Sequence, residues 1–390
     1  MSYRIYSDLT VDRIYVTRGA FPLVEGRLAR ALPSLPRHVI NHRNEIPREH
    51  LNQHTLFVKR PDGPIVGRCP GTRGHVCCNY LTVDLYVGCN LGCSYCIMRS
   101  YLNFSPLTVH VGLHDAVADI RRIAAENADR TVRIGSGETG DSLLLDPIFE
   151  SSARLIEALA DLDNVILELK SKTDLVDHLL ELPRKGNAVI AFSLNPDAVA
   201  AVEEGVAAPV EHRLAAARRA VAAGYRIAFH FDPVIALPEW QDHYGPLIDA
   251  LGQFNPEKVV WISLGTIRYT PALRDKMDDR PYLLDEFVPG RDGKYRYLQQ
   301  ERVGVYRWLR ERLYRAIPAP VYMCMESATV WRKVFGALPE QLPELTPIFS
   351  PVRIPGRQRT ERTGRTEGTE RTDGTERTDG TERTDGTERT

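Results

Sequence analysis

The stretch Leu81–Cys96, LTVDLYVGCNLGCSYC, decides how the fold of this chain is interpreted. Its first half contains the run Thr82–Val87, which is rich in β-branched and aromatic residues and predicts a strand. Its second half places Cys89, Cys93 and Cys96 in a C-x3-C-x2-C pattern directly after that strand. The sequence therefore predicts a cysteine-bearing loop at the end of a strand.

Three thiolates on one short loop can hold iron or zinc, but they leave a four-coordinate centre one protein ligand short. In a [4Fe–4S] cluster the cysteines would bind three irons and leave the fourth iron open to a small molecule. In a zinc site the fourth ligand would have to be His75, Cys77, Cys78 or water. Gly88 and Gly92 permit the tight turns that aim three sulfurs at one point.

Repeated β-α units extend from this loop as far as Gly265, because short β-branched runs alternate with longer amphipathic stretches. The expected strands are Thr82–Val87, Thr131–Gly135, Val165–Leu169, Ala188–Ser193, Arg226–Phe231 and Lys258–Ser263. The expected helices are Leu113–Asn127, Pro147–Asp161, Asp174–Leu182, Pro209–Ala223 and Pro238–Phe254. These units predict an α/β fold, a partial (β/α)6 barrel of the TIM type over residues 81–265. In such folds chemistry gathers at the C-terminal ends of the strands.

The rest of the chain divides into three segments by composition. Residues 1–80 are rich in Pro and Arg with weak periodicity and are expected to form an N-terminal extension. Residues 266–352 are expected to form a C-terminal cap with a helix at Leu298–Arg315 and a late strand at Pro320–Cys324. Residues 353–390 end in a repeated RTDGTE hexamer without apolar side chains, which predicts a disordered tail.

Composition excludes several classes of protein. With 390 residues and 43% hydrophobic side chains the chain can bury a core, so it is not a disordered or fibrous protein. The formal charge is -1, but residues 1–75 and 291–335 each carry +6 and residues 76–290 carry -11. Basic flanks would suit a polyanionic substrate, although solvated surface is the explanation that the sequence favours. The sequence has no membrane span or signal peptide and an odd number of cysteines, which predicts a cytoplasmic protein with reduced thiols and no membrane partner.

The cysteine loop resembles the signature of the radical S-adenosylmethionine (radical SAM) superfamily, in which an aromatic residue precedes the last cysteine. Cys89, Cys93, Tyr95 and Cys96 meet that pattern. The resemblance implies that the cysteines hold a [4Fe–4S] cluster whose open iron binds S-adenosylmethionine. One electron, from a donor such as flavodoxin or ferredoxin, then cleaves this cofactor to methionine and a 5′-deoxyadenosyl radical, which abstracts hydrogen from a substrate.

Within that superfamily the sequence is similar to spore photoproduct lyase and its relatives from about Cys69 to Phe335. The pieces that carry this likeness are Cys69-Pro70, Asp141-x4-Asp146, Lys172-x5-His178, Phe192-Ser193-Leu194-Asn195 and Ala223-Gly224-Tyr225. The resemblance implies that Lys172 and Ser193 help to hold S-adenosylmethionine and that Tyr95 lines the cleavage site. It also implies a lyase-like enzyme whose substrate is a damaged base in DNA.

Glu138, in Ser136-Gly137-Glu138, resembles the small-small-Glu turn with which radical SAM enzymes grip the methionine ammonium, although a first-turn helix acid is the alternative. Spore photoproduct lyase has its hydrogen-returning cysteine at the position that Glu138 matches and a second tyrosine where this chain has Ile97. We therefore expect a relative of that enzyme. Cys324 is a candidate for returning hydrogen instead, with a packing cysteine as the alternative.

Two other functions stay open at this point. A radical SAM enzyme could act on a small molecule or peptide, and a zinc-stabilised nucleic-acid-binding module would have no catalysis. His230 and Asp232 follow the fifth predicted strand and are candidates for substrate contacts. The roles of Cys69, Cys77 and Cys78 stay open.

Overall fold

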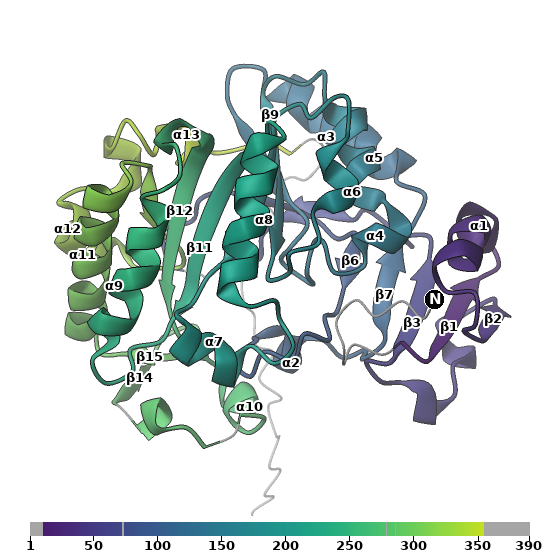
Figure 1. Ribbon diagram of the computed structural model, residues 1–390, viewed down its shortest axis with the longest axis horizontal. Helices are drawn as coiled ribbons and strands as arrows, with labels where there is room; N and C mark the ends of the chain where they lie inside the picture. Colours follow the sequence, from purple (N-terminus) through teal and green to yellow (C-terminus); the bar gives the residue numbers. More distant parts are fainter. Residues whose placement is uncertain (1–10, 72–73, 278, 285, 355–390) are drawn as a thin grey trace, which may run out of the picture. The chain divides into compact units, whose positions relative to one another are not determined.

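The structure of this chain is a computed structural model that describes residues 11–71, 74–277, 279–284 and 286–354 (Figure 1). All of these residues belong to one compact unit. Of the predicted tail, residues 355–390 lie outside the described ranges.

The central element is a curled sheet in the order β16-β12-β11-β10-β9-β8-β5-β4. Its strands are β4 (Val66–Arg68), β5 (Leu81–Val83), β8 (Val132–Gly135), β9 (Val165–Ser171), β10 (Ala188–Ser193), β11 (Arg226–Val234), β12 (Val259–Thr266) and β16 (Val321–Met323). Only β4 is antiparallel to its neighbour. Most residues of these strands are buried, so both faces of the sheet are covered. The fold is the half-barrel that the sequence predicts.

Helices on the outer side connect the strands, and Figure 1 shows α8, α9 and α11 along the sheet. The helices are α1 (Phe21–Ala31), α2 (Met98–Tyr101), α3 (His114–Glu126), α4 (Asp146–Phe149), α5 (Ser151–Leu159), α6 (Asp177–Leu180), α7 (Asp197–Glu203), α8 (Val210–Ala222), α9 (Trp240–Leu251), α10 (Pro271–Arg274), α11 (Gln299–Ala316), α12 (Ala328–Phe335) and α13 (Thr346–Phe349). The predicted helix Pro147–Asp161 is in fact two, because Glu150 adopts a left-handed φ of 53° between them.

The N-terminal region forms a second sheet. Its strands β1 (Arg13–Thr17), β2 (Arg37–Ile40) and β3 (Thr55–Lys59) join β7 (Leu107–His110) and β6 (Tyr86–Val87) in the order β2-β1-β3-β7-β6. The predicted strand Thr82–Val87 is therefore divided between the two sheets. The predicted boundary at residues 80 and 81 does not coincide with a boundary between sheets, since β6 and β7 pair with each other and β7 pairs with β3.

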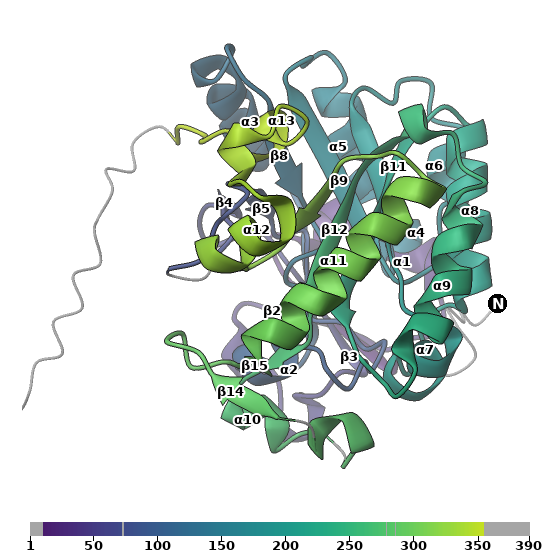
Figure 2. The same cartoon turned by 90° about the vertical axis from the view of Figure 1, so that its left-hand side faces the viewer.

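The C-terminal segment contributes to the half-barrel as well as covering it. The late strand β16 pairs with β12 in parallel, so it is a seventh parallel strand rather than part of a separate cap. A small antiparallel sheet of β13 (Arg268–Tyr269), β15 (Tyr295–Tyr297) and β14 (Phe287–Pro289) follows β12. Figures 1 and 2 show this small sheet with α2, α7 and α10 at one end of the half-barrel. That end is where the parallel strands have their C-termini.

A seam closes the gap between the first and last strands of the half-barrel. We define the seam as residues 74–79, which precede β5, and residues 324–326, which follow β16. The amide of Val76 donates to the carbonyl of Glu326 at 2.9 Å in an isolated antiparallel bridge. The carboxylate of Glu326 is buried and accepts from Arg302 Nε at 2.9 Å and from the Tyr306 hydroxyl at 3.1 Å. These bonds fix the position of the bridge.

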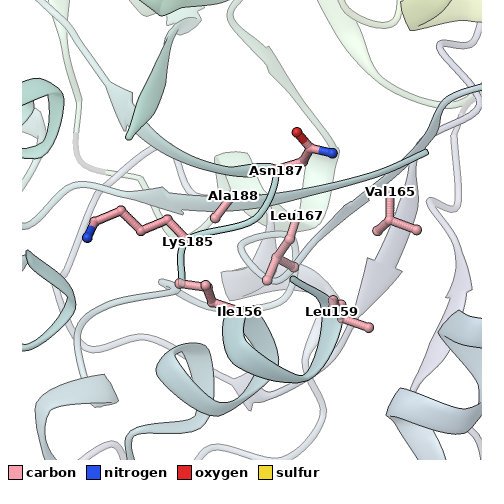
Figure 3. Close-up of a pocket in the computed structure, with 7 residues that line it drawn as sticks. All are labelled: Ile156, Leu159, Val165, Leu167, Lys185, Asn187 and Ala188. Carbon is pink, nitrogen blue, oxygen red and sulfur yellow. The ribbon is translucent and has the colours of Figure 1, made fainter. Parts of the chain in front are cut away.

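A small pocket lies at the opposite end of the sheet, among α5 and the N-terminal halves of β9 and β10 (Figure 3). Its lining is mostly aliphatic and it has room for about one water molecule. We assign no chemistry to it. Within the ranges described, no helix has the length and hydrophobicity needed to cross a bilayer.

Candidate active site

The cysteine loop is fastened to its neighbours on both sides by backbone hydrogen bonds. It runs from β6 to α2 and carries Cys89, Cys93 and Cys96. On one side the Gly88 amide donates to the Thr139 carbonyl at 2.9 Å. On the other side the amides of Ser94 and Val206 make 2.8 Å bonds to the carbonyls of Glu203 and Leu91, respectively. The loop therefore lies between the turn after β8 and the turn after α7.

Close backbone approach requires glycine at one contact of this loop. Gly205 has a φ of +54°, and a Cβ atom at that position would lie 2.2 Å from the Leu91 carbonyl oxygen. No side chain fits at that distance, so the loop depends on Gly205 for its position.

The three thiols lie close enough to influence one another's protonation. Burial raises the pKa of the Cys89 thiol well above its usual value, and the neighbouring charges of Asp141, Cys93 and Cys96 raise it further. Burial likewise raises the pKa of Cys93 to about 12, although the Lys172 ammonium opposes this effect. At neutral pH both groups are thiols in the metal-free chain, so binding of a metal centre releases protons.

Three cysteine thiols form the donor set of this loop. Thiolates are the ligands that iron–sulfur clusters and zinc prefer, so these residue types fit either kind of centre. Across the described part of the chain, no three His, Cys, Asp or Glu side chains are grouped so that they could hold one metal ion.

Tyr95 belongs to a buried polar network centred on Glu204. The Tyr95 hydroxyl and the Arg213 guanidinium both donate to the Glu204 carboxylate, and Asn195 Nδ2 donates to it at 3.0 Å. Burial alone would raise the pKa of Glu204, but Lys172, Arg213 and these hydrogen bonds outweigh it and hold the pKa below its usual value. Glu204 is therefore an anion that orients Tyr95.

Lys172 and Ser193 lie at the ends of two neighbouring strands, β9 and β10. Lys172 Nζ lies 3.9 Å from Glu204 Oε1 and 5.6 Å from the centre of the Tyr95 ring. The buried Asp141 carboxylate accepts from the Lys172 amide at 2.8 Å, which ties the turn after β8 to the end of β9. Ser193 ends β10, is buried, and accepts from Arg213 through its carbonyl at 2.8 Å.

Glu138 forms an ion pair that the sequence did not predict. Lys170 Nζ donates to Glu138 Oε1 at 2.5 Å, with 22% and 29% of the two side chains exposed. Burial lowers the pKa of Lys170, but Glu138 and Glu168 outweigh that effect and hold it above its usual value. Glu168 and Lys170 alternate along β9 and share one face, and Lys172 continues the same spacing directly after the strand. This period-two signal could have revealed Lys170. For Glu204, which lies 109 residues from Tyr95, we find no such signal.

His230 and Asp232 make internal contacts. His230 is buried and lies between Glu168 Oε1, at 2.7 Å from Nε2, and Ser263 Oγ, at 2.6 Å from Nδ1. Asp232 accepts both bonds of a bidentate pair with Arg268 at 3.1 Å. His230 thus stabilises the inside of the half-barrel, whereas Asp232 and Arg268 lie toward the end where β13 begins.

Cys324 follows β16 at the seam and is partly buried. Burial raises the pKa of its thiol well above the usual value, and the nearby charges of Asp232, Cys78 and Glu138 raise it further while Arg268 lowers it. Cys324 follows β16 and Glu138 follows β8, so both lie at the C-terminal end of the half-barrel.

The chain was compared with known proteins. The family model for spore photoproduct lyase matches residues 76–280, which is more than half of the chain. Spore photoproduct lyase of Geobacillus sp. is 29% identical over 172 residues, and that of Bacillus subtilis is 27% identical over 178 residues. These matches cover 44% and 45% of this chain, and the chain spans about half the length of either relative.

Solved structures of spore photoproduct lyase share the fold. One mutant enzyme superposes with a TM-score of 0.71 at 22% identity, over 81% of this chain and 99% of that one. A second mutant, with bound AdoMet and dinucleoside spore photoproduct, gives a TM-score of 0.70 at 21% identity, over 81% and 98% of the two chains. Taken with the extent of the family-model match, these likenesses show that the chain belongs to the spore photoproduct lyase family.

Proposed function

We propose that this protein is a radical SAM enzyme in which Cys89, Cys93 and Cys96 hold a [4Fe–4S] cluster. The observation that carries the proposal is the position of the cysteine loop, which is fixed between the Glu138 turn and the Glu203–Val206 turn. That position is at the C-terminal ends of the parallel strands, where barrel enzymes carry out their chemistry. When bound, the cluster and S-adenosylmethionine supply a 5′-deoxyadenosyl radical.

Four side chains of this chain would hold S-adenosylmethionine. Glu138 offers a carboxylate to the methionine ammonium, which would replace Lys170 as its cationic partner. Lys172 offers an ammonium to the methionine carboxylate, and Ser193 lies at the end of the adjacent strand β10. Tyr95 keeps its proton, since burial and Glu204 raise its pKa well above the usual value, and its ring lines the cleavage site.

Cys324 is the proposed hydrogen donor to the product radical. In the family the donor cysteine stands where this chain has Glu138, so another group must supply the hydrogen atom. Cys324 lies at the same end of the half-barrel as Glu138, and its raised pKa keeps the S–H bond intact at neutral pH. In the proposed step the carbon radical takes the hydrogen atom of Cys324, and a thiyl radical stays on the Cys324 sulfur.

A lesion in DNA is the substrate that we favour. A solved relative holds dinucleoside spore photoproduct, and this likeness supports the choice. The cations of the small antiparallel sheet and of α11 add no support, because they bind within the protein. Arg268 binds Asp232 and Arg296 binds Asp292, while on α11 Arg302 binds Glu326, Arg307 binds the Lys333 carbonyl and Arg312 binds Asp249.

An electron donor and a cellular compartment complete the proposal. A ferredoxin- or flavodoxin-type protein would supply the electron that cleavage requires. The seven cysteines are free thiols, which favours a reducing compartment, the cytoplasm.

The test is anaerobic reconstitution with iron and sulfide, followed by reduction with dithionite in the presence of S-adenosylmethionine. We expect bound iron and formation of 5′-deoxyadenosine, which increases when dinucleoside spore photoproduct or irradiated DNA is added. Cys93→Ala should lose the iron, whereas Cys77→Ser, at an exposed cysteine, should keep it. Absence of 5′-deoxyadenosine would refute the proposal that this protein is a radical SAM enzyme. Indifference to DNA would favour a small-molecule or peptide substrate, and zinc in place of iron would favour the nucleic-acid-binding module.

A further inference from the structure

A row of paired residues leads from the cysteine loop to the outer edge of the N-terminal sheet, the sheet with the order β2-β1-β3-β7-β6 (Figure 1). The row has one residue from each of the five strands: Val87, Thr108, Phe57, Tyr15 and His38. Val87 directly precedes the cysteine loop, so the row begins at the candidate active site. Since neighbouring strands lie about 4.8 Å apart, the four steps of the row span roughly 19 Å.

One face of this row carries aromatic rings. The Tyr15 ring stacks on the His38 imidazole with their centres 4.8 Å apart, and its hydroxyl lies 2.6 Å from Nδ1 of His50. The Phe57 ring meets the edge of the Phe104 ring at 5.7 Å between centres. Because Phe104 lies between α2 and β7, this face also adjoins the segment that follows the cysteine loop.

Residues 41–54, which connect β2 to β3, pack on this face and expose two arginines. The Arg43 guanidinium lies 5.8 Å from the centre of the Phe104 ring. The side chains of Arg43 and Arg48 are exposed, and neither forms an ion pair with any residue in the described ranges. The carboxylate of Glu45 accepts instead from the backbone amides of two residues that precede Arg43, at 2.9 and 2.7 Å.

The N-terminal sheet offers cations that the small antiparallel sheet does not. Residues 1–75 contain twelve Lys and Arg against six acids, a formal charge of +6. In the small sheet Arg268 is paired with Asp232, while Lys294 and Arg296 are paired with Asp292. Cations without a carboxylate partner can neutralise phosphates and release their counterions. A polyanion held at the site therefore finds its available charges on the side of the N-terminal sheet.

We propose that Arg43 and Arg48 bind the phosphate backbone of the DNA that flanks the lesion, so that the strand leaves the active site across the N-terminal sheet. This inference rests on the proposed function. At about 3.4 Å per nucleotide, a span of roughly 19 Å places these contacts within about six nucleotides of the lesion. Contacts with phosphate position a duplex without reading its sequence, which suits an enzyme that meets its lesion in any sequence.

The binding face is tested with a fluorescein-labelled duplex of about 24 base pairs and the reconstituted full-length protein, by fluorescence anisotropy at several salt concentrations. The double variant Arg43→Glu with Arg48→Glu should weaken binding at least about tenfold and lower the slope of log K against log salt by about two, one for each lost phosphate contact. Arg43→Lys with Arg48→Lys should keep most of the affinity, because it keeps both charges.

The matched control is Arg184→Glu with Arg218→Glu. It changes the net charge by the same amount at two exposed arginines, one in the turn before β10 and one on α8, and should bind the duplex like the wild type. If the control and Arg43→Glu with Arg48→Glu have equal affinities, the inference is wrong.

Turnover separates contact with flanking DNA from an effect on the site itself. With dinucleoside spore photoproduct, which has no flanking nucleotides, Arg43→Glu with Arg48→Glu should match the wild type. With the same lesion at the centre of the duplex, its KM should rise about tenfold while kcat changes little. Equal losses with both probes would overturn the inference. Absence of 5′-deoxyadenosine in every protein, including the wild type, would instead refute the proposed function, and the binding measurement would then decide the inference.

Discussion

Removing the Glu204 carboxylate should destabilise the fold strongly. Glu204 is 1% exposed and accepts from Arg213, which is also 1% exposed, as well as from Tyr95 and Asn195. In Glu204→Ala the guanidinium would be left buried without its anion. Breaking a buried pair in this way costs about 3–5 kcal/mol, whereas Glu204→Gln, which keeps an acceptor and loses only the charge, should cost about 1.5–3 kcal/mol.

The measurement is urea unfolding of the metal-free protein at pH 7, followed by tryptophan fluorescence and circular dichroism. Glu344→Ala is the matched control, because Glu344 is exposed, and it should change the free energy of unfolding by no more than about 0.5 kcal/mol. The double variant Glu204→Leu with Arg213→Met removes both charges and should be more stable than Glu204→Ala.

The same variants report on the site. Glu204 fixes the Tyr95 hydroxyl and lies 3.9 Å from Lys172, so Glu204→Gln should also weaken the binding of S-adenosylmethionine to the reconstituted protein. If Glu204→Ala unfolds within about 1 kcal/mol of the wild type, the carboxylate does not hold a buried network, and the reasoning from burial and charge is wrong.

Three further outcomes are expected. Gly205→Ala should cost at least about 2 kcal/mol of unfolding free energy and lower the iron bound per chain, because its Cβ would meet a carbonyl at 2.2 Å. The control Gly304→Ala, in open space on α11, should leave the unfolding free energy unchanged or raise it. Equal effects of the two variants in urea unfolding would contradict this prediction. Although burial raises the pKa of Glu168, His230, Arg133 and Lys170 hold it below the usual value, so the stability that Glu168 contributes is present above about pH 4.3 and is lost as the pH falls further. In urea unfolding, the free energy of unfolding of Glu168→Gln should therefore approach that of the wild type in acid. A difference that stays constant from pH 7 to pH 3 would contradict the assignment. In the metal-free chain iodoacetamide should label the exposed Cys77 before the buried Cys93, whose pKa is raised to about 12, and peptide mapping in the opposite order would refute that assignment.

The half-barrel could be predicted because its signals are local. Strand β10 has the bounds Ala188–Ser193 that the periodicity predicts, and α8 and α11 differ from their predicted ends by a residue or so. A buried parallel strand is a short apolar run between amphipathic helices, and both patterns can be recognised within one window of sequence.

The remaining parts of the fold depend on pairings that no local pattern encodes. Strand β16 joins β12 across more than fifty residues, and β7 leaves the barrel segment to pair with β3. Leu85 lies between β5 and β6, where the chain passes from one sheet to the other within a run that reads as one strand. The sequence therefore predicted the late strand Pro320–Cys324 but not its pairing with β12, and it predicted no strand in residues 1–80, where the structure has β1, β2, β3 and β4.

The candidate site, too, could be predicted from the sequence only in part. The cysteine loop is recognisable by its spacing, and the roles of its residues stay predictions. The partners Lys170, Glu204 and Arg213 come from other segments, and only tertiary contact brings them to Glu138 and Tyr95.

The anchoring of the cysteine loop on both flanks also affects the order of assembly. Since amides of Gly88, Ser94 and Val206 already secure this segment through bonds that need no metal, the polypeptide arranges it during folding. The cofactor then binds to a loop that is already ordered, so its binding costs the chain little further conformational entropy. Folding of the metal-free protein should therefore not depend on the cofactor, in contrast to a small zinc domain, which folds only when metal binds.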